Sequence, residues 1–324
     1  MLSRPALCLL WTLFALTFAS VGIGDNAVPK IGVLMRVAAN WPGEHGLLEG
    51  LGQHGYVDGK NVLIEWRRAS SDLADLRSLA AELVTRKVDV IVAFSTPAAV
   101  AALEATNTIP VVFAAAGDPL ATGLATSLAR PAGNATGISI QATEIAVKRF
   151  DLLHQLGVRA RRVVYLVNLA NPSGPPQLEP LRQAAKTMGM TLEVVDVHTA
   201  EEIHRALRSI PWRSIGGIVI GGDTIQLQEA DEIARVVQRA RVPAVFPYRE
   251  YHRFGALLSY GPNLQRVYER TAYYVDRILK GAKPAELPVE QWSKFELIVD
   301  LRIARKMGIK VPQELLYRAD EVIQ

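Results

Sequence analysis

Polar and aromatic side chains gather where six short apolar runs of the chain end. In the first half, these segments contain Arg36 with Asn40-Trp41-Pro42, then Ser95-Thr96-Pro97, then Gly117-Asp118-Pro119. In the second half, they are residues 168–174, which begin with Asn168, residues 221–224 around Asp223, and residues 247–250 with Tyr248 and Arg249. In open α/β sheets, ligands bind outside the carboxyl ends of the strands. The spacing therefore predicts a binding site built from strand-end loops.

The segment Ser95-Thr96-Pro97 has the residue types of a helix start. Ser or Thr at the cap with Pro in the first turn leaves backbone N–H groups and a hydroxyl available. Such a helix N-terminus suits a carboxylate or a phosphate. The alternative is that Ser95, Thr96 and Asp118 simply cap helices.

The other candidates also have structural alternatives. Trp41 and Tyr248 could be core aromatics, and Arg249 with Glu250 could be a solvated ion pair. Tyr260 could be a packed strand residue. The joint pattern favours a site, because two α/β halves facing each other across a cleft would hold a small polar ligand and exclude water.

Signatures of catalysis and of metal binding are scarce in this sequence. The six histidines are dispersed, and His198 and His204 lack the spacing of a zinc helix. Gly50-Leu51-Gly52-Gln53-His54-Gly55 matches a dinucleotide motif formally, but its glycines end a helix and precede a strand. We read Gly55 as a helix cap and expect Gly50 and Gly52 to allow close packing. We expect that the protein is not an enzyme and that it binds no cofactor and no metal ion.

Short β-branched runs alternate with helical patterns along the whole chain, which is typical of a mostly parallel sheet. The first half predicts strands at 31–35, 62–66, 88–94 and 111–115, helices at 44–55, 72–87, 97–106 and 123–129, and a turn-rich crossover at 130–137. The second half predicts strands at 163–167, 191–197, 217–220, 244–246, 255–260 and 295–299, with helices at 144–156, 178–188, 201–209, 228–240, 264–280 and 301–307. The pattern predicts two successive α/β halves.

The N-terminus and the composition limit the cellular context. An apolar run at residues 6–19 follows Arg4 and ends among small residues, so we expect residues 1–22 to be a cleaved signal peptide. Cleavage would remove Cys8, the only cysteine, and an uncleaved anchor is the alternative. The net charge of +4 is spread over 36 basic and 32 acidic residues, which argues against nucleic-acid binding.

Ten segments together resemble the substrate-binding proteins of a tryptophan/tyrosine-type ABC transporter family. They include Leu-Gly-Gln-His-Gly-Tyr-Val-Asp-Gly-Lys-Asn at residues 51–61, Ser95-Thr96-Pro97-Ala98 and Gly117-Asp118-Pro119. The others are residues 79–92, 109–113, 127–137, 258–262, 278–284, 294–297 and 319–323. The resemblance covers about residues 30–323.

The resemblance implies the type I periplasmic-binding-protein fold, which is an α/β fold of two doubly wound parallel-sheet lobes joined by a three-segment hinge. We expect lobe 1 to span 29–139 with 264–282, and lobe 2 to span 140–263 with 283–324, with the last crossing at 281–284. It also implies a monomeric periplasmic receptor that passes a small-molecule ligand to an ABC permease in the inner membrane.

The resemblance implies that the ligand is an aromatic amino acid. Aromatic acids, other amino acids and small amides are alternative ligands. The resemblance implies that Ser95, Thr96 and adjacent N–H groups hold a carboxylate. Asp223, with Asp118, would hold an ammonium, and Trp41 and Tyr248 would stack on the side chain. Arg36 departs from the family pattern and could pair with an anionic group. The expected ligand-binding residues are Arg36, Trp41, Ser95, Thr96, Asp118, Asn168, Asp223, Tyr248, Arg249 and Tyr260.

Three alternatives remain at this point. A receptor could serve a membrane sensor instead of a permease. A lactose-repressor-type regulator uses the same fold, but it would need a helix-turn-helix where the sequence has an export signal. An enzyme on this scaffold would need a nucleophile with its base, and the sequence supplies no such set.

Overall fold

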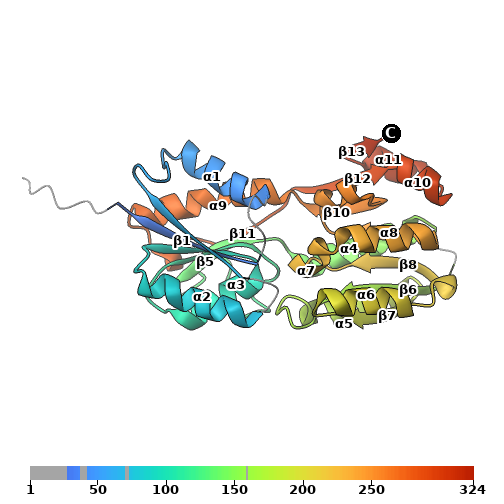
Figure 1. Cartoon of the computed structure of the whole chain (residues 1–324), viewed down its shortest axis with the longest axis horizontal. Helices are drawn as coiled ribbons and strands as arrows, with labels where there is room; N and C mark the ends of the chain where they lie inside the picture. Colours follow the sequence, from blue (N-terminus) through green and yellow to red (C-terminus); the bar gives the residue numbers. More distant parts are fainter. Residues whose placement is uncertain (1–27, 37–41, 70–72, 158–159) are drawn as a thin grey trace, which may run out of the picture.

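Two mostly parallel sheets, each covered by helices on both faces, form the molecule (Figure 1). The computed structural model describes residues 28–36, 42–69, 73–157 and 160–324. The expected signal peptide and Trp41 lie outside these residues. The predicted fold class, two doubly wound α/β halves, is confirmed.

The first sheet has the strand order β11-β5-β4-β3-β1-β2, and all its pairs are parallel. Its strands are β1 (Lys30–Met35), β2 (Leu63–Arg68), β3 (Val90–Phe94), β4 (Val111–Ala116), β5 (Ala135–Ser139) and β11 (Glu290–Gln291). The central strands β3 and β4 are buried along their whole length. Continuous apolar runs form them because helices cover both faces.

The second sheet has the order β13-β12-β10-β9-β8-β6-β7, and only the β10–β12 pair is antiparallel among its described strands. The strands are β6 (Arg162–Val167), β7 (Thr191–Asp196), β8 (Ile215–Ile220), β9 (Ala244–Phe246), β10 (Leu258–Pro262), β12 (Phe295–Asp300) and β13 (Glu321–Ile323).

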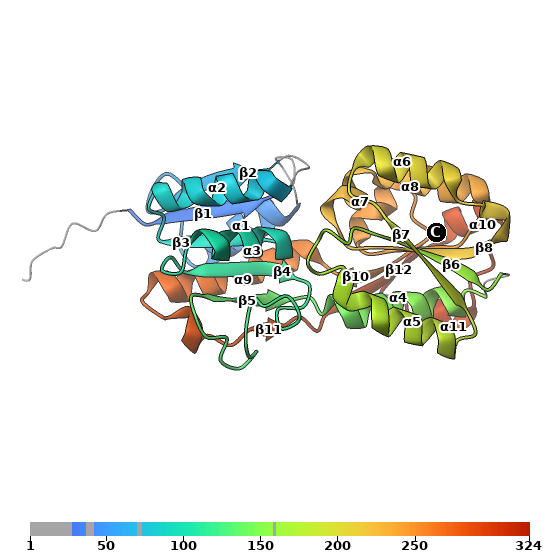
Figure 2. The ribbon, with the colours of Figure 1, turned by 90° about the horizontal axis from the view of Figure 1, so that it is seen from below.

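Helices sandwich both sheets. On the first sheet, α1 (Pro42–Gln53) and α9 (Leu264–Leu279) cover one face, and α2 (Leu73–Thr85) and α3 (Thr96–Ala105) cover the other. On the second sheet, α6 (Ala200–Ser209) and α8 (Ala230–Ala240) lie opposite α4 (Ala142–Gln155) and α5 (Leu178–Thr187) (Figure 2). The short helices α7 (Thr224–Gln228), α10 (Leu301–Met307) and α11 (Gln313–Arg318) complete the second half. Within the described part of the chain, no helix has the length and apolarity that crossing a bilayer requires.

The chain passes three times between the two sheets. It crosses from β5 to α4, returns from β10 to α9, and crosses again from β11 to β12. The last passage was expected at 281–284 but lies after Gln291, because β11 pairs with β5 at the edge of the first sheet. The strand β11 is only two residues long, so the sequence contains no alternating hydrophobic pattern from which it could be predicted.

Two further sequence predictions are wrong in the same region. Residues 123–129 form a turn and bends rather than a helix, and residues 135–137 of the supposed crossover belong to β5. Thr136 and Gly137 make this run look like a turn, yet Gly137 has φ +150 and packs against the carbonyl of Phe113. Gly137 therefore allows β5 to approach β4 closely and does not form a turn.

One glycine of the apparent dinucleotide motif, Gly50, serves the packing of α1 on α9. A Cβ on Gly50 would come within 2.2 Å of the carbonyl oxygen of Glu269, and one on Gly46 would come equally close to that of Gln265. Gly55 follows the helix with φ +85. The interpretation as packing and cap is confirmed for Gly50 and Gly55. It is wrong for Gly52, which faces open space.

Candidate functional site

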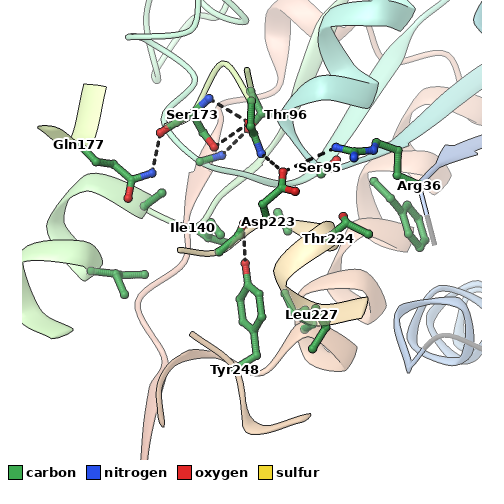
Figure 3. A pocket seen from close by; sticks show the side chains of 18 of the residues that line it. Arg36, Ser95, Thr96, Ile140, Ser173, Gln177, Asp223, Thr224, Leu227 and Tyr248 are labelled. Atoms are coloured by element: carbon green, nitrogen blue, oxygen red, sulfur yellow. Dashed lines mark hydrogen bonds and ion pairs between the residues drawn. The ribbon is translucent and has the colours of Figure 1, made fainter. Parts of the chain in front are cut away.

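A pocket lies between the carboxyl ends of strands from both sheets (Figure 3). It holds about 800 Å³, part of which is continuous with solvent. Its polar lining consists of Arg36, Ser95, Thr96, Arg149, Asn171, Ser173, Gln177, Asp223, Thr224 and Tyr248. Its apolar lining includes Phe94, Ala115, Ile140, Ala142, Ile145, Leu227, Leu264 and Tyr268. Five of the ten predicted residues line it: Arg36, Ser95, Thr96, Asp223 and Tyr248.

Asp223 is the carboxylate of this pocket and is 6% exposed. It follows β8 as the N-cap of α7, where its Oδ1 accepts a hydrogen bond of 3.0 Å from the amide of Ile225. Nδ2 of Asn171 donates to Oδ2 at 2.6 Å, and Nδ2 of Asn168 donates to Oδ1 at 3.3 Å. Nη1 of Arg36, which is 3% exposed, lies 3.6 Å from Oδ2. Asp223 therefore caps α7 and also lines the pocket, and its contact with a ligand stays a prediction.

A chain of buried hydrogen bonds fixes the loop that follows β6. Oδ1 of Asn171 accepts from the amide and from the hydroxyl of Ser173, at 3.0 and 2.9 Å. Nε2 of Gln177 donates to the carbonyl of Ser173 at 2.6 Å, and the hydroxyl of Tyr165 donates to Oε1 of Gln177 at 2.6 Å. Such a network holds the amide of Asn171 against Asp223 in one orientation.

The backbone at Ser95 is strained. Its φ of 90° and ψ of 164° lie in a region that is essentially reserved for glycine. The amide of Ser95 donates to the carbonyl of Ala114, and its side chain does not cap α3. Oγ1 of Thr96 accepts from the amide of Gly117 at 2.8 Å, which ties the end of β3 to the end of β4. Strain of this kind clusters at ligand sites.

Aromatic rings form part of the pocket wall. Phe94 stacks on Tyr268 with ring centroids 4.0 Å apart and an interplanar angle of 25°. The hydroxyl of Tyr248 donates to the carbonyl of Gly222 at 3.4 Å, and burial raises the pKa of Tyr248 to about 12. Tyr248 is buried, as the core alternative predicted, and it also lines the pocket, so its contact with a ligand stays a prediction.

Arg149 lines the pocket and was not predicted. It lies on α4 and is 4% exposed. Its Nε donates to the carbonyl of Tyr260 at 2.7 Å, and its Nη2 donates to that of Pro247 at 3.2 Å. Its signal in the sequence is its position on the apolar stripe of the helix, between Ile145 and Leu152. An arginine there contradicts the polar-outside pattern of an amphipathic helix.

Three predicted site residues lie elsewhere. Asp118 closes a turn, where its Oδ1 accepts from the amide of Ala121 at 3.2 Å. Arg249 forms ion pairs of 2.9 Å with Glu296 and with Glu321 near the surface, so the solvated-pair reading was right about Arg249 but wrong about Glu250 as its partner. The ring of Tyr260 packs on Phe295 at 5.9 Å, as the strand alternative predicted, and only its carbonyl reaches Arg149. Each was chosen because it follows or lies on a strand, which fixes the loop but not the direction of the side chain.

The remaining two predicted site residues are Asn168 and Trp41. Asn168 is not among the residues that line the pocket, and its Nδ2 donates to Oδ1 of Asp223. Trp41 falls outside the described residues. Within the described ranges, no three side chains of the types His, Cys, Asp or Glu come together as ligands for a metal ion.

Comparisons with known proteins agree with this architecture. Residues 31–323 match the model of the family described as ABC transporter substrate binding protein. A protein of Clostridioides difficile named tyrosine-binding protein is 26% identical over 255 residues, which cover 79% of this chain and 73% of that protein.

Solved structures are similar over nearly the whole chain. The structure of an ABC domain in complex with L-Trp from Streptococcus pneumonia has a TM-score of 0.84 and 26% identity, and covers 92% of this chain and 100% of that one. A conserved domain protein from Vibrio cholerae has a TM-score of 0.85 and 26% identity, over 91% and 100% of the two chains.

Proposed function

The chain belongs to the ABC transporter substrate binding protein family, and from this premise we propose that it binds an aromatic amino acid, or a related aromatic acid or amide, as an exported receptor. Its fold is the type I periplasmic-binding-protein fold. The proposed site is the pocket between the two sheets. The receptor would release its ligand to a permease in the inner membrane, and would act in the periplasm as a monomer after loss of residues 1–22.

One observation carries the proposal: side chains from the strand ends of both sheets converge on a single pocket. Phe94 and Thr96 come from the first sheet, and Asp223 and Tyr248 come from the second. A ligand that contacts both lobes binds one relative arrangement of them better than others, and this differential affinity drives hinge closure. A permease that distinguishes the closed form from the open one would then recognise the loaded receptor.

The lining supports an aromatic ligand. Phe94, Tyr268 and Leu227 offer an apolar wall, and aromatic rings gain from stacked or edge-to-face contacts beyond the area that they bury. The relatives named for tyrosine and solved with L-Trp bind such ligands. The polar groups of the lining would fix the orientation of the ligand.

Asp223 is our candidate for the ligand's ammonium group. Its two oxygens already accept from Asn171, Asn168 and the amide of Ile225. Arg36 at 3.6 Å is the most distant of its partners, beyond hydrogen-bond length. We propose that the ammonium takes the place of Arg36 on Oδ2 when an amino acid binds. Ser95 and Thr96 would line the other side of the ligand.

A thermal-shift screen of residues 23–324 tests this function. The panel holds the twenty amino acids, indole-3-acetate, 4-hydroxybenzoate and the matching amides. A bound ligand stabilises the folded protein by about 2.7 kcal/mol at a hundredfold excess over its Kd. We expect the largest shift with L-tryptophan or L-tyrosine. A shift with aliphatic amino acids alone would contradict the aromatic ligand, and no shift with any compound would contradict the site.

A further inference from the structure

Arg149 is a buried cation whose charge no carboxylate of the described residues neutralises. Its side chain is 4% exposed, and no Asp or Glu of the described residues forms an ion pair with it. Its two hydrogen bonds go to backbone carbonyls, those of Tyr260 and Pro247. Because a guanidinium has five N–H donors, these bonds leave part of its fork for another acceptor.

The titratable groups that act on the charge of Arg149 are tyrosines, and they do not supply a negative charge. Tyr165, Tyr248 and Tyr251 interact with it electrostatically, and burial raises the pKa of each, to about 12 for Tyr248. All three are therefore neutral at physiological pH. Burial also lowers the pKa of Arg149, which is the mark of a charge held away from water.

The other charges of the pocket lining balance each other. Arg36 and Asp223 form an ion pair, so Arg149 leaves the lining with one excess positive charge. An isolated buried charge is costly unless a partner of opposite sign arrives. Space for that partner exists in the pocket, because Arg149 is one of its lining residues.

The N-terminus of α3 is the competing anion site, and it is poorly equipped. The amide of Ser95 already donates to Ala114, and Pro97 has no N–H. The hydroxyl oxygen of Thr96 already accepts from the amide of Gly117. A guanidinium fork matches a carboxylate better than the donors that remain there.

We propose that Arg149 binds the carboxylate of the ligand, so that this pocket takes anionic or zwitterionic ligands and rejects their neutral amides. This inference rests on the proposed function for the location of the site, but it does not depend on the ligand being aromatic. It replaces Ser95 and Thr96 as the carboxylate-binding residues.

The test measures Kd by titration calorimetry for matched pairs of an acid and its amide. The pairs are L-tryptophan and L-tryptophanamide, phenylacetate and phenylacetamide, and L-leucine and L-leucinamide. The proteins are wild type, Arg149→Gln and Arg149→Lys. Arg249→Gln is the control, because it removes an arginine that pairs with Glu296 and Glu321 outside the pocket.

We expect wild type and Arg249→Gln to prefer the acid of a bound pair by at least about 30-fold, as loss of one partner of a buried charge pair predicts. Arg149→Gln should lose that preference, and Arg149→Lys should keep a reduced one. Arg149→Lys retains a donor for the carbonyls of Tyr260 and Pro247. It therefore separates the loss of charge from a failure to fold, which circular dichroism checks for each variant.

Each outcome of the titrations either supports or overturns the role of Arg149. If Arg149→Gln folds and still prefers acids as wild type does, or if wild type binds amides equally well, the inference is overturned. If only L-leucine binds and its preference over the amide needs Arg149, the inference stands and the aromatic ligand fails. If no acid binds wild type, both fail.

Discussion

The guanidinium of Arg36 lies 3.6 Å from the carboxylate of Asp223 and joins the end of β1 to the end of β8, which belong to different sheets. Both residues are almost completely buried. A buried ion pair adds little net stability, because desolvation offsets the attraction, but it fixes a geometry. This pair therefore fixes how the ends of β1 and β8 meet across the pocket, and the proposed ligand would compete with Arg36 for Asp223.

Loss of the Asp223 carboxylate should weaken binding strongly. We expect Asp223→Ala to lower the affinity for L-tryptophan by about 2–5 kcal/mol, because the ammonium would be buried without a partner. Asp118→Ala is the matched control, since Asp118 only closes a turn with Ala121 and should leave the affinity unchanged. Titration calorimetry of both variants measures this. Equal affinities for the two variants would remove Asp223 from the site.

Replacement of Ser95 should separate strain from function. We expect Ser95→Gly to raise the free energy of unfolding by about 1 kcal/mol, because a strained non-glycine residue costs about 1–3 kcal/mol and glycine loses some of this gain in entropy. Ser95→Ala keeps the strained φ of 90° and should not stabilise the protein. Urea unfolding compares the two variants. If Ser95→Gly is no more stable than Ser95→Ala, the strain is absent in solution.

Two glycines of one helix provide a matched pair for the packing of α1 on α9. Gly50→Ala places a Cβ 2.2 Å from the carbonyl oxygen of Glu269 and should destabilise the protein by about 1–3 kcal/mol. Gly52→Ala faces open space and should stabilise it by up to about 1 kcal/mol through helix propensity. Thermal unfolding of both variants gives the comparison. Similar melting temperatures would mean that the two helices separate at little cost.

His252 should make stability depend on pH. Burial lowers its pKa from 6.5 to about 4, although Asp300 opposes the shift. Its Nε2 pairs with Oγ of Ser259 at 2.8 Å. Because the unfolded chain binds a proton that the folded chain resists, the stability is full above pH 6.5 and falls as the pH drops towards 4.

The loss between pH 7 and pH 5 should be about 2 kcal/mol from this group. Urea unfolding of wild type and His252→Asn at the two pH values measures it, and the variant should lose correspondingly less. The same slope in both proteins would show that His252 is not the source.

The sequence predicts the two α/β halves because buried strands and amphipathic helices have recognisable patterns of apolar residues. β3 and β4 read as unbroken apolar runs, and α8 as a clear amphipathic helix. It does not predict β11, since two residues carry no period. It mistakes β5 for a turn, because Gly137 serves a close approach to Phe113 that no local pattern reveals.

The sequence likewise predicts some features of the candidate site and misses others. Strand-end position identifies the loops of Ser95 and Asp223 because parallel strands bring their carboxyl ends to one edge. It cannot say that Arg249 turns to Glu296 at the surface, since that pair is distant in sequence. Arg149 is missed because strand-end reasoning ignores helices, yet an arginine on an apolar stripe is itself a signal of a buried partner.

The most direct measurement is the crystal structure of the protein grown with L-tryptophan. We predict electron density for the ligand in the pocket between the sheets, with its ring on the wall of Phe94 and Tyr268 and its ammonium at hydrogen-bond distance from Asp223. Density only in another hollow, such as the one lined by His54 and Trp292, or an empty pocket at saturating ligand, would contradict the account.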